Sequence, residues 1–437
     1  MFHRLALAAL LVFSSSAVSA QTLSESIKQD YDDYLWPLYD HFHRNPELPL
    51  AETETALRMA TELAKLEFDV HEGVGGTGVV AIMENGEGPL VMVRADMDGL
   101  PVEERSGLPN ASKARQVDPV DGVEYPVMHA CGHDMHMTSL IGAARQMAAR
   151  RNEWQGTLML IAQPAEERGM GARMMREDNV WERFGQPDYA LSFHVRAPFV
   201  AGTVNLVKAP WSGVDSVDIV VHGVGGHGAA PHATKDPVVL GSQIVIALQM
   251  LVSRELPATE PAVVTVGSFH SGTKHNIISD KAVLQLTVRS RNEETRRILL
   301  DGIERIAINT ARAAGLPEDK LPEVTVANET VPPTINDSDL MQRVLTAWQQ
   351  GIEPERLTSI EEKTMGGEDF PYFTLDPYIP SVYWAIGGTP AEDFEAAANG
   401  GPAVPEHHSA LFKIAPEPSV RAGVESTVLA LMELMVQ

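Results

Sequence analysis

Short apolar runs alternate with amphipathic segments over much of the chain, and this alternation predicts an α/β fold. Four apolar runs have the length of buried strands: 79–83, 90–93, 157–162 and 189–193. Apolar residues at helical spacing predict helices over residues 52–68 and 139–150. Because strands that alternate with helices usually form parallel sheets, we expect a domain with a mostly parallel central sheet.

The pattern changes near Trp211, where a second group of elements begins. Residues 216–221 alternate polar and apolar side chains, as a half-exposed strand does. The elements predicted next are a helix over 237–252, strands over 262–269 and 282–288, a helix over 293–314 and a strand over 324–327. This order fits a small α+β, ferredoxin-like sheet with two helices on one face. We therefore predict an inserted domain at residues 212–328.

The rest of the chain returns to the first pattern. Helices over 337–349 and 421–435 and a strand over 381–386 complete the larger domain, which comprises residues 21–211 and 329–437. Residues 110–125 are polar and show little periodicity, which predicts a surface loop.

The first twenty residues have the pattern of a secretory signal. A basic start precedes an apolar run of nine residues, Leu5 to Phe13, and small residues lead to a cleavage position after Ala20. The apolar run is far shorter than the roughly 20 residues that a membrane span needs. We expect residues 1–20 to be a signal peptide and the mature protein to be exported, periplasmic or secreted, without a membrane anchor.

The net charge and the cysteine content argue against a nucleic-acid partner and against an internal disulfide. The formal net charge is -25, from 59 acidic and 34 basic residues, so nucleic acid is not an expected partner. Cys131 is the single cysteine, which rules out an internal disulfide. A lone thiol in an oxidising compartment therefore needs burial or a bound metal.

The neighbourhood of Cys131 has the chemistry of a metal site. Cys131 and His133 are two positions apart, and thiolate and imidazole are good ligands for zinc and related metals. Asp134 and His136 add further candidate ligands. The alternative is a buried cysteine beside surface histidines.

A pair of carboxylates gives the second signal. Glu166 and Glu167 follow the strand predicted at 157–162, and ligand sites in open α/β sheets gather at that edge. Two adjacent carboxylates in one site repel each other unless a cation lies between them. His194, directly after the strand predicted at 189–193, and His408, preceded by His407, are weaker candidates.

An ordered set of motifs joins these residues. The segments are HRNPEL at 43–48, RADMDGLP at 94–101, CGHD at 131–134, PAEE at 164–167, FH at 193–194, GGHGAAPH at 225–232, HNII at 275–278, MGGEDF at 365–370 and HSALF at 408–412. Together they resemble the metallopeptidase-type amidohydrolases that include hippurate hydrolases and auxin-conjugate hydrolases, relatives of the aminoacylases and carboxypeptidase G. The resemblance covers essentially the whole mature chain.

The resemblance implies a zinc-exopeptidase-like catalytic domain that holds two divalent metal ions per subunit. The implied ligands are Cys131, His133, Glu167, His194 and His408. The thiolate favours zinc, while manganese, nickel and cobalt stay open. Asp98 would support the ligands from behind.

The implied catalytic groups come from both domains. Glu166 would be the general base for a metal-activated water, and His227 would stabilise the oxyanion, often in the partner subunit's active site. Asn276 would help to bind the substrate carboxylate. The inserted domain would be a lid and dimerisation domain, which makes the protein a homodimer.

We therefore expect an exported, metal-dependent amidohydrolase that acts on N-acyl amino acids or related small amides. A dipeptidase or carboxypeptidase using the same site is one alternative. A non-catalytic periplasmic metal-binding protein is another, although it would leave Glu166 and His227 without a role. Trp211, at a position where relatives often have a smaller residue, and the loop at 110–125 are departures that bear on specificity.

Overall fold

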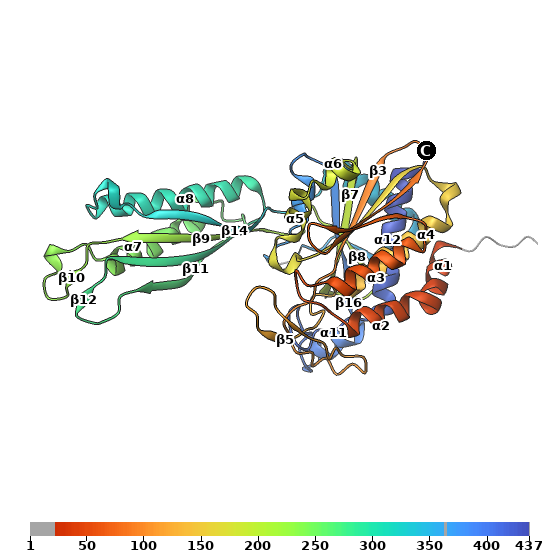
Figure 1. Ribbon diagram of the computed structural model, residues 1–437, viewed down its shortest axis with the longest axis horizontal. Helices are drawn as coiled ribbons and strands as arrows, with labels where there is room; N and C mark the ends of the chain where they lie inside the picture. The colour runs from red at the N-terminus through yellow and green to blue at the C-terminus, as the bar shows by residue number, and fades with distance from the viewer. Residues whose placement is uncertain (1–21, 362–364, 437) are drawn as a thin grey trace, which may run out of the picture.

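The chain forms two bodies, a larger one and an elongated smaller one (Figure 1). The computed structural model describes residues 22–361 and 365–436. The predicted signal peptide at 1–20 lies outside these residues and stays a prediction.

An eight-stranded sheet forms the centre of the larger body. Its strands, in spatial order, are β1 (Asp69–Val74), β2 (Gly78–Asn85), β6 (Gly156–Gln163), β3 (Leu90–Asp96), β7 (Tyr189–Val200), β16 (Ser381–Thr389), β8 (Val204–Asn205) and β15 (Leu357–Thr358). β6, β3, β7 and β16 run parallel to one another. β1 pairs antiparallel with β2, β2 with β6, and β8 with β16, whereas β15 runs parallel to β8. The predicted mostly parallel α/β fold is therefore confirmed.

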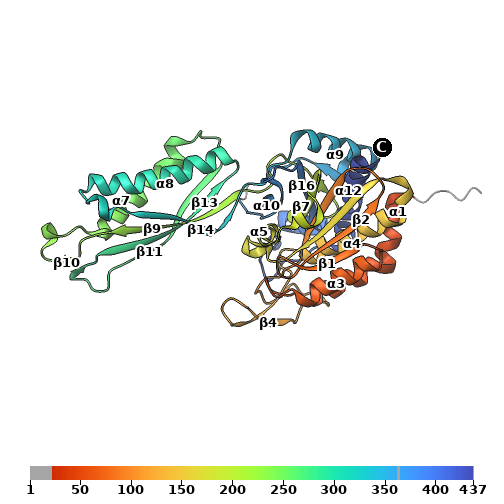
Figure 2. The ribbon, with the colours of Figure 1, turned by 45° about the horizontal axis from the view of Figure 1, so that its top comes forward.

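Helices cover both faces of this sheet (Figure 2). One face packs against α1 (Leu23–Asp30), α2 (Trp36–Arg44), α3 (Thr53–Ala64), α4 (His133–Ala149), α9 (Ser338–Gly351) and α12 (Pro416–Met435), and the other against α5 (Gly171–Glu177), α6 (Val180–Phe184) and α10 (Pro371–Thr374). The strand periodicity of two explains this arrangement: Val91 and Val93 join the first core, and Met92 joins the second. α11 (Ala391–Ala398) has no buried residue.

The smaller body is a four-stranded antiparallel sheet with a core of its own. The strand order is β11 (Ala262–Ser271), β13 (Lys281–Ser290), β9 (Gly213–His222) and β14 (Glu323–Val331). α7 (Pro237–Met250) and α8 (Glu293–Ala313) pack on it, with Leu240, Ile244 and Ile303 buried against Leu284 and its neighbours. β9 and β14 lie nearest to the domain limits at 212 and 328, which remain a prediction.

A short two-stranded ribbon forms the far end of the smaller body. It consists of β10 (Gly226–His227) and β12 (Ile277–Ile278), and Figure 1 shows it at the end most distant from the larger body. By length and composition alone, one helix of the described residues, Pro237–Glu255, could cross a membrane. A single such helix is weak evidence, and its buried face belongs to the core of the smaller body.

Several predicted element limits are wrong. β7 continues to Val200, so His194 lies within a strand rather than after one. α4 begins at His133 rather than near Ser139, because its first turn carries polar residues that hide the helical pattern. The segment predicted as a loop at 110–125 includes a hairpin of β4 (Arg115–Val117) and β5 (Glu124–Pro126).

Candidate active site

Cys131 and His133 lie side by side because the chain turns sharply between them. Gly132 has φ 89°, a conformation that costs glycine little, and α4 starts immediately after it. Both side chains are buried. Cys131, His133 and His194 each offer a ligand atom, and these three atoms lie within 4.8 Å of one another.

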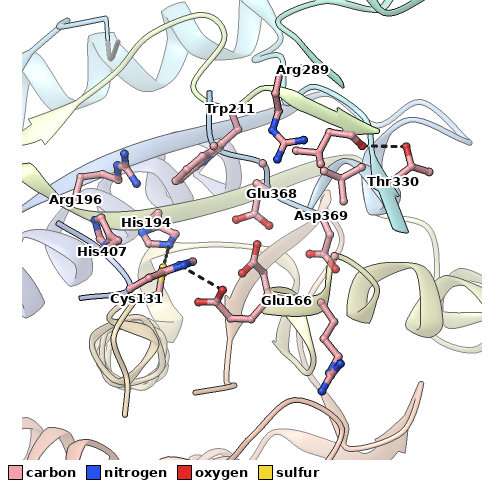
Figure 3. A pocket seen from close by; sticks show the side chains of 18 of the residues that line it. Cys131, Glu166, His194, Arg196, Trp211, Arg289, Thr330, Glu368, Asp369 and His407 are labelled. Atoms are coloured by element: carbon pink, nitrogen blue, oxygen red, sulfur yellow. Dashed lines mark hydrogen bonds and ion pairs between the residues drawn. The ribbon is translucent and has the colours of Figure 1, made fainter. Parts of the chain in front are cut away.

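His194 reaches this cluster from the neighbouring strand. The register pairs Arg94 of β3 with Ser192 of β7, which places His194 level with Asp96 at the carboxyl end of β3. The His194 Nδ1 lies 2.6 Å from the Val195 carbonyl, so Nδ1 carries the proton and Nε2 keeps a lone pair. That Nε2 lies 3.4 Å from the Cys131 Sγ, a contact that a dashed line marks in Figure 3.

The two glutamates enter from the end of β6. Glu166 and Glu167 form a single turn, η3 (Glu166–Arg168), after Ala165, whose φ of 50° redirects the chain. The His133 Nε2 lies 4.0 Å from Glu166 Oε2 and 3.9 Å from Glu167 Oε1. Burial, assisted by the charges of Glu368 and Glu167, raises the pKa of the Glu166 carboxyl well above its usual range.

His408 closes the cluster from the C-terminal part of the chain. It has φ 63°, and its amide donates to the Ala130 carbonyl at 2.9 Å. The His408 Nε2 lies 3.4 Å from Glu167 Oε2, although more than half of its side chain is exposed. The neighbouring His407 turns elsewhere, and its Nε2 accepts a hydrogen bond from the Ala197 amide at 3.0 Å.

Asp98 contacts two of the candidate ligand residues, His133 and Glu167. Its Oδ1 lies 3.3 Å from the His133 Nδ1, and its Oδ2 accepts a hydrogen bond from the Glu167 amide at 2.9 Å. This one carboxylate therefore orients a histidine and fixes the backbone of η3. The structure thus brings together all of the predicted ligands, Glu166 and Asp98.

The donor set fits divalent metal ions. A buried thiol, imidazoles and carboxylates converge, and His133 Nε2 and Glu167 Oε1 are buried without a hydrogen-bond partner among the described residues. Burial disfavours a charged His133, yet Asp96, Asp98 and Glu167 outweigh burial and raise the pKa of this imidazole to about 10. The cluster therefore favours positive charge at its centre, which metal ions supply.

His227 and Asn276 are not part of this cluster. His227 lies in β10, Asn276 directly precedes β12, and both side chains are exposed at the far end of the smaller body (Figure 1). Neither residue lines the cavity beside the cluster. Within one chain, the structure leaves these two predicted residues apart from the site.

A cavity of about 660 Å³ opens beside the metal ligands. Trp211 and Arg289 line its wall opposite Cys131 and Glu166 (Figure 3). The Trp211 ring lies 5.2 Å from the His194 ring, and the Arg196 guanidinium stacks over it at 4.7 Å. Trp211 therefore packs directly on a candidate ligand.

Arg289 is a candidate that sequence reasoning missed. It is half-buried in β13, and it donates hydrogen bonds to Thr287 Oγ1 at 2.6 Å and the Val288 carbonyl at 3.2 Å. Among the described residues, no carboxylate lies within ion-pair distance of its guanidinium. Burial lowers its pKa, with the Asp215 charge acting in the opposite direction. A cation that is partly desolvated and lacks a carboxylate partner is suited to bind an anionic ligand.

Comparison with known proteins finds relatives that match most of the chain. The sequence profile of peptidase family M20/M25/M40 matches residues 92–403. The hippurate hydrolase of Campylobacter jejuni is 36% identical over 334 residues, which are 76% of this chain and 82% of that protein. Thermostable carboxypeptidase 2 of Saccharolobus solfataricus is 35% identical over 376 residues, 84% of this chain and 89% of that protein.

A solved structure is similar over nearly the full length. It is a dinuclear metal-binding peptidase of the M20 family from Bacillus subtilis, with a TM-score of 0.74 and 27% identity. The match covers 94% of this chain and 99% of that one. The expected two-metal site thus has a counterpart in a structure of the same architecture.

Proposed function

Because this chain belongs to peptidase family M20/M25/M40, we propose that it hydrolyses the amide bond of N-acyl amino acids with Glu166 as general base. It is a metal-dependent amide-bond hydrolase, and the alternative of a non-catalytic metal carrier is set aside. The observation that carries the proposal is the convergence of Glu166 and Glu167 with a buried Cys131 and two histidines at one edge of the sheet.

Five side chains would hold two divalent metal ions: Cys131, His133, Glu167, His194 and His408. When bound, the ions supply Lewis acidity and lower the pKa of water. The Cys131 thiolate favours zinc. Elemental analysis of the purified protein tests this choice, and manganese as the native metal would contradict it.

Glu166 has the position and chemistry of a proton carrier. Its Oε2 lies 4.0 Å from the His133 Nε2, which is too long for a hydrogen bond, and no other described cation forms an ion pair with it. Because burial raises the pKa of this carboxyl, Glu166 can accept a proton from water and later deliver one to the leaving amine.

Paired variants test this role. We expect Glu166→Gln to keep its metal and to lose at least about 10² in turnover, the usual scale for a general base. The matched Glu167→Gln should lose metal instead. Full activity of Glu166→Gln would overturn the assignment.

Arg289 supports an amino acid as the leaving half of the substrate. A guanidinium binds a carboxylate through two parallel hydrogen bonds, and Arg289 lines the same cavity as Glu166. A cavity of about 660 Å³ has room for both an acyl group and an amino acid.

A carboxypeptidase or dipeptidase is the second candidate. The named carboxypeptidase relative favours it, and Arg289 would hold the C-terminal carboxylate of a peptide equally well. Parallel assays on N-acetyl, N-benzoyl and dipeptide substrates with the same C-terminal amino acid distinguish the two. Faster cleavage of the dipeptide would favour the second candidate.

We further propose a homodimer in which His227 and Asn276 act in the partner's site. Their exposure, and the place of β10 and β12 far from the larger body, support this role (Figure 1). The test is to mix Glu166→Gln with His227→Ala after dissociation. Mixed dimers would contain one complete site, so about a quarter of wild-type activity should return. No recovery would contradict the trans arrangement.

The proposed export depends on residues 1–20. Expression of the full chain in a bacterial host followed by N-terminal sequencing should give Gln21 as the first residue of the periplasmic or secreted protein. Retention of Met1 in the cytoplasm would contradict export.

A further inference from the structure

The far end of the smaller body is basic in an otherwise acidic protein. We call it the tip and define it as residues 222–235 and 270–281. It carries the lysines 235, 274 and 281 and the histidines 222, 227, 232, 270 and 275, but only one carboxylate, Asp280. The consecutive residues Lys274, His275 and Asn276 are all exposed, and the next residue, Ile277, is 53% exposed. Lys235 donates to the Ala314 carbonyl and His222 pairs with Glu323, so the exposed segment 274–277 offers a lysine, a histidine and an apolar side chain.

The hairpin of β4 and β5, residues 115–126, has the complementary character. Its turn exposes Val117, Val120 and Val123 at 54%, 63% and 47%. Asp121, between Val120 and Val123, is exposed, whereas Asp118 is buried against Arg168 and Glu124 pairs with Arg115 at 2.9 Å. A hairpin that exposes several branched apolar side chains beside acidic groups is a candidate interaction surface.

This hairpin lies beside the catalytic cavity. Asp118 forms a 2.6 Å ion pair with Arg168, which lines the cavity and directly follows Glu167. The hairpin is also anchored to the larger body, since Gln116 bonds with the Leu48 amide at 2.6 Å and the Ala51 carbonyl at 3.0 Å. Figures 1 and 2 both show it on the side of the larger body that is nearest to the smaller one.

We propose that the hairpin of one subunit is the docking surface for the tip of a second copy of this chain. The inference rests on the proposed dimer and adds the surface that receives His227 and Asn276. In such a pair, the exposed Lys274 of the tip would meet the exposed Asp121 of the hairpin, and the exposed Ile277 and Val224 would cover its valines. Because both surfaces are on the same chain, two copies can dock reciprocally about a twofold axis. A second copy is favoured over an unrelated partner, because only it brings the two predicted residues that the site lacks.

Three substitutions at Val120 test the charge complementarity. Val120→Gln is the neutral reference, Val120→Glu adds a negative charge and Val120→Lys a positive one, all at a position with no side-chain hydrogen bond to lose. We expect the dimer to bind most tightly in Val120→Glu and most weakly in Val120→Lys. Two symmetric contacts of exposed charges predict a difference of about 10-fold in the dissociation constant at low salt. Fluorescence-detected sedimentation at nanomolar concentration measures it.

Reversing a charge on the tip tests the same contact from the other side. In a Lys274→Glu background, we expect the order to invert, so that Val120→Lys binds more tightly than Val120→Glu. The matched control is Leu57, which is 50% exposed on α3, where the Lys and Glu variants should be equal. Molar salt should compress all of these differences, because it screens exposed charges.

The outcomes separate the two proposals. Equal dissociation constants for the Glu and Lys variants, or the same order in both backgrounds, would overturn the docking surface. If the docking-surface test fails in this way but mixing Glu166→Gln with His227→Ala still restores activity, the proposed dimer stands and only the docking surface is wrong. A chain that is monomeric throughout would overturn both proposals.

Discussion

Arg289→Ala should weaken recognition of the substrate carboxylate and leave the stability of the fold nearly unchanged. The Arg289 guanidinium lines the cavity and donates to Thr287 Oγ1 and the Val288 carbonyl, and none of the described carboxylates forms an ion pair with it. Its burial is therefore only partly compensated, which is why its pKa is lowered. Removing it breaks no ion pair among the described residues, and we expect the melting temperature to change by no more than a few degrees.

The expected kinetic effect follows from the bond that the guanidinium would make. A hydrogen bond to a charged group contributes about 1.5–3 kcal/mol, which corresponds to roughly 10- to 150-fold in kcat/KM. The assay compares an N-acyl amino acid with its C-terminal carboxamide in both enzymes. Wild type should prefer the carboxylate, and Arg289→Ala should lose most of that preference through the carboxylate substrate alone. Arg289→Lys should retain part of it, because lysine keeps the charge without the bidentate geometry.

An equal loss for the carboxylate and the carboxamide would refute the reasoning. In that case Arg289 would act on the fold or on the amide itself rather than on the carboxylate.

Three further variants test the architecture around the site. Gly132→Ala would place a Cβ 2.4 Å from Val195 Cγ1 at φ 89°, so we expect lower metal content and a lower melting temperature, measured by elemental analysis and calorimetry. Arg94 is fully buried among three carboxylates, and Arg94→Met should cost about 3–5 kcal/mol of unfolding free energy in urea titrations. Burial disfavours a charged His43, but Asp134 and Glu104 outweigh it and raise the pKa to about 10. This raised pKa stabilises the fold below pH 6.5, and the stabilisation is lost as the pH rises toward 10. The difference in melting temperature between wild type and His43→Gln should shrink over that interval; a constant difference would contradict it.

Much of the larger sheet could be predicted because its central strands are buried on both faces. The apolar runs at 90–93 and 157–162 correspond to β3 and β6, which lie next to each other. The N-terminal helices α1 and α2 were not predicted. α1 buries only Ile27, and the buried face of α2 consists mainly of aromatic residues and a histidine rather than of aliphatic residues. The hairpin at 115–126 was missed because its valines face solvent and mark no core.

The candidate ligands could be predicted from residue type and position in the motifs. Their convergence depends on strand register, which the sequence alone does not show: His194 lies within β7, yet it is level with the end of β3. Arg289 was missed because a single arginine on an alternating strand resembles an ordinary surface residue. Its significance comes from partial burial without a carboxylate partner in the part of the chain that the structure describes, and only the folded chain shows this.

The most direct test measures metal content and amide hydrolysis on the same sample. The protein from residue 21 onward would be analysed for bound metal and assayed on N-acyl amino acids before chelation, after chelation and after metal is restored. We expect two divalent ions per chain, loss of hydrolysis with their removal and recovery when zinc or manganese is added. Undiminished hydrolysis by protein shown to be free of metal would contradict metal-dependent catalysis at this site.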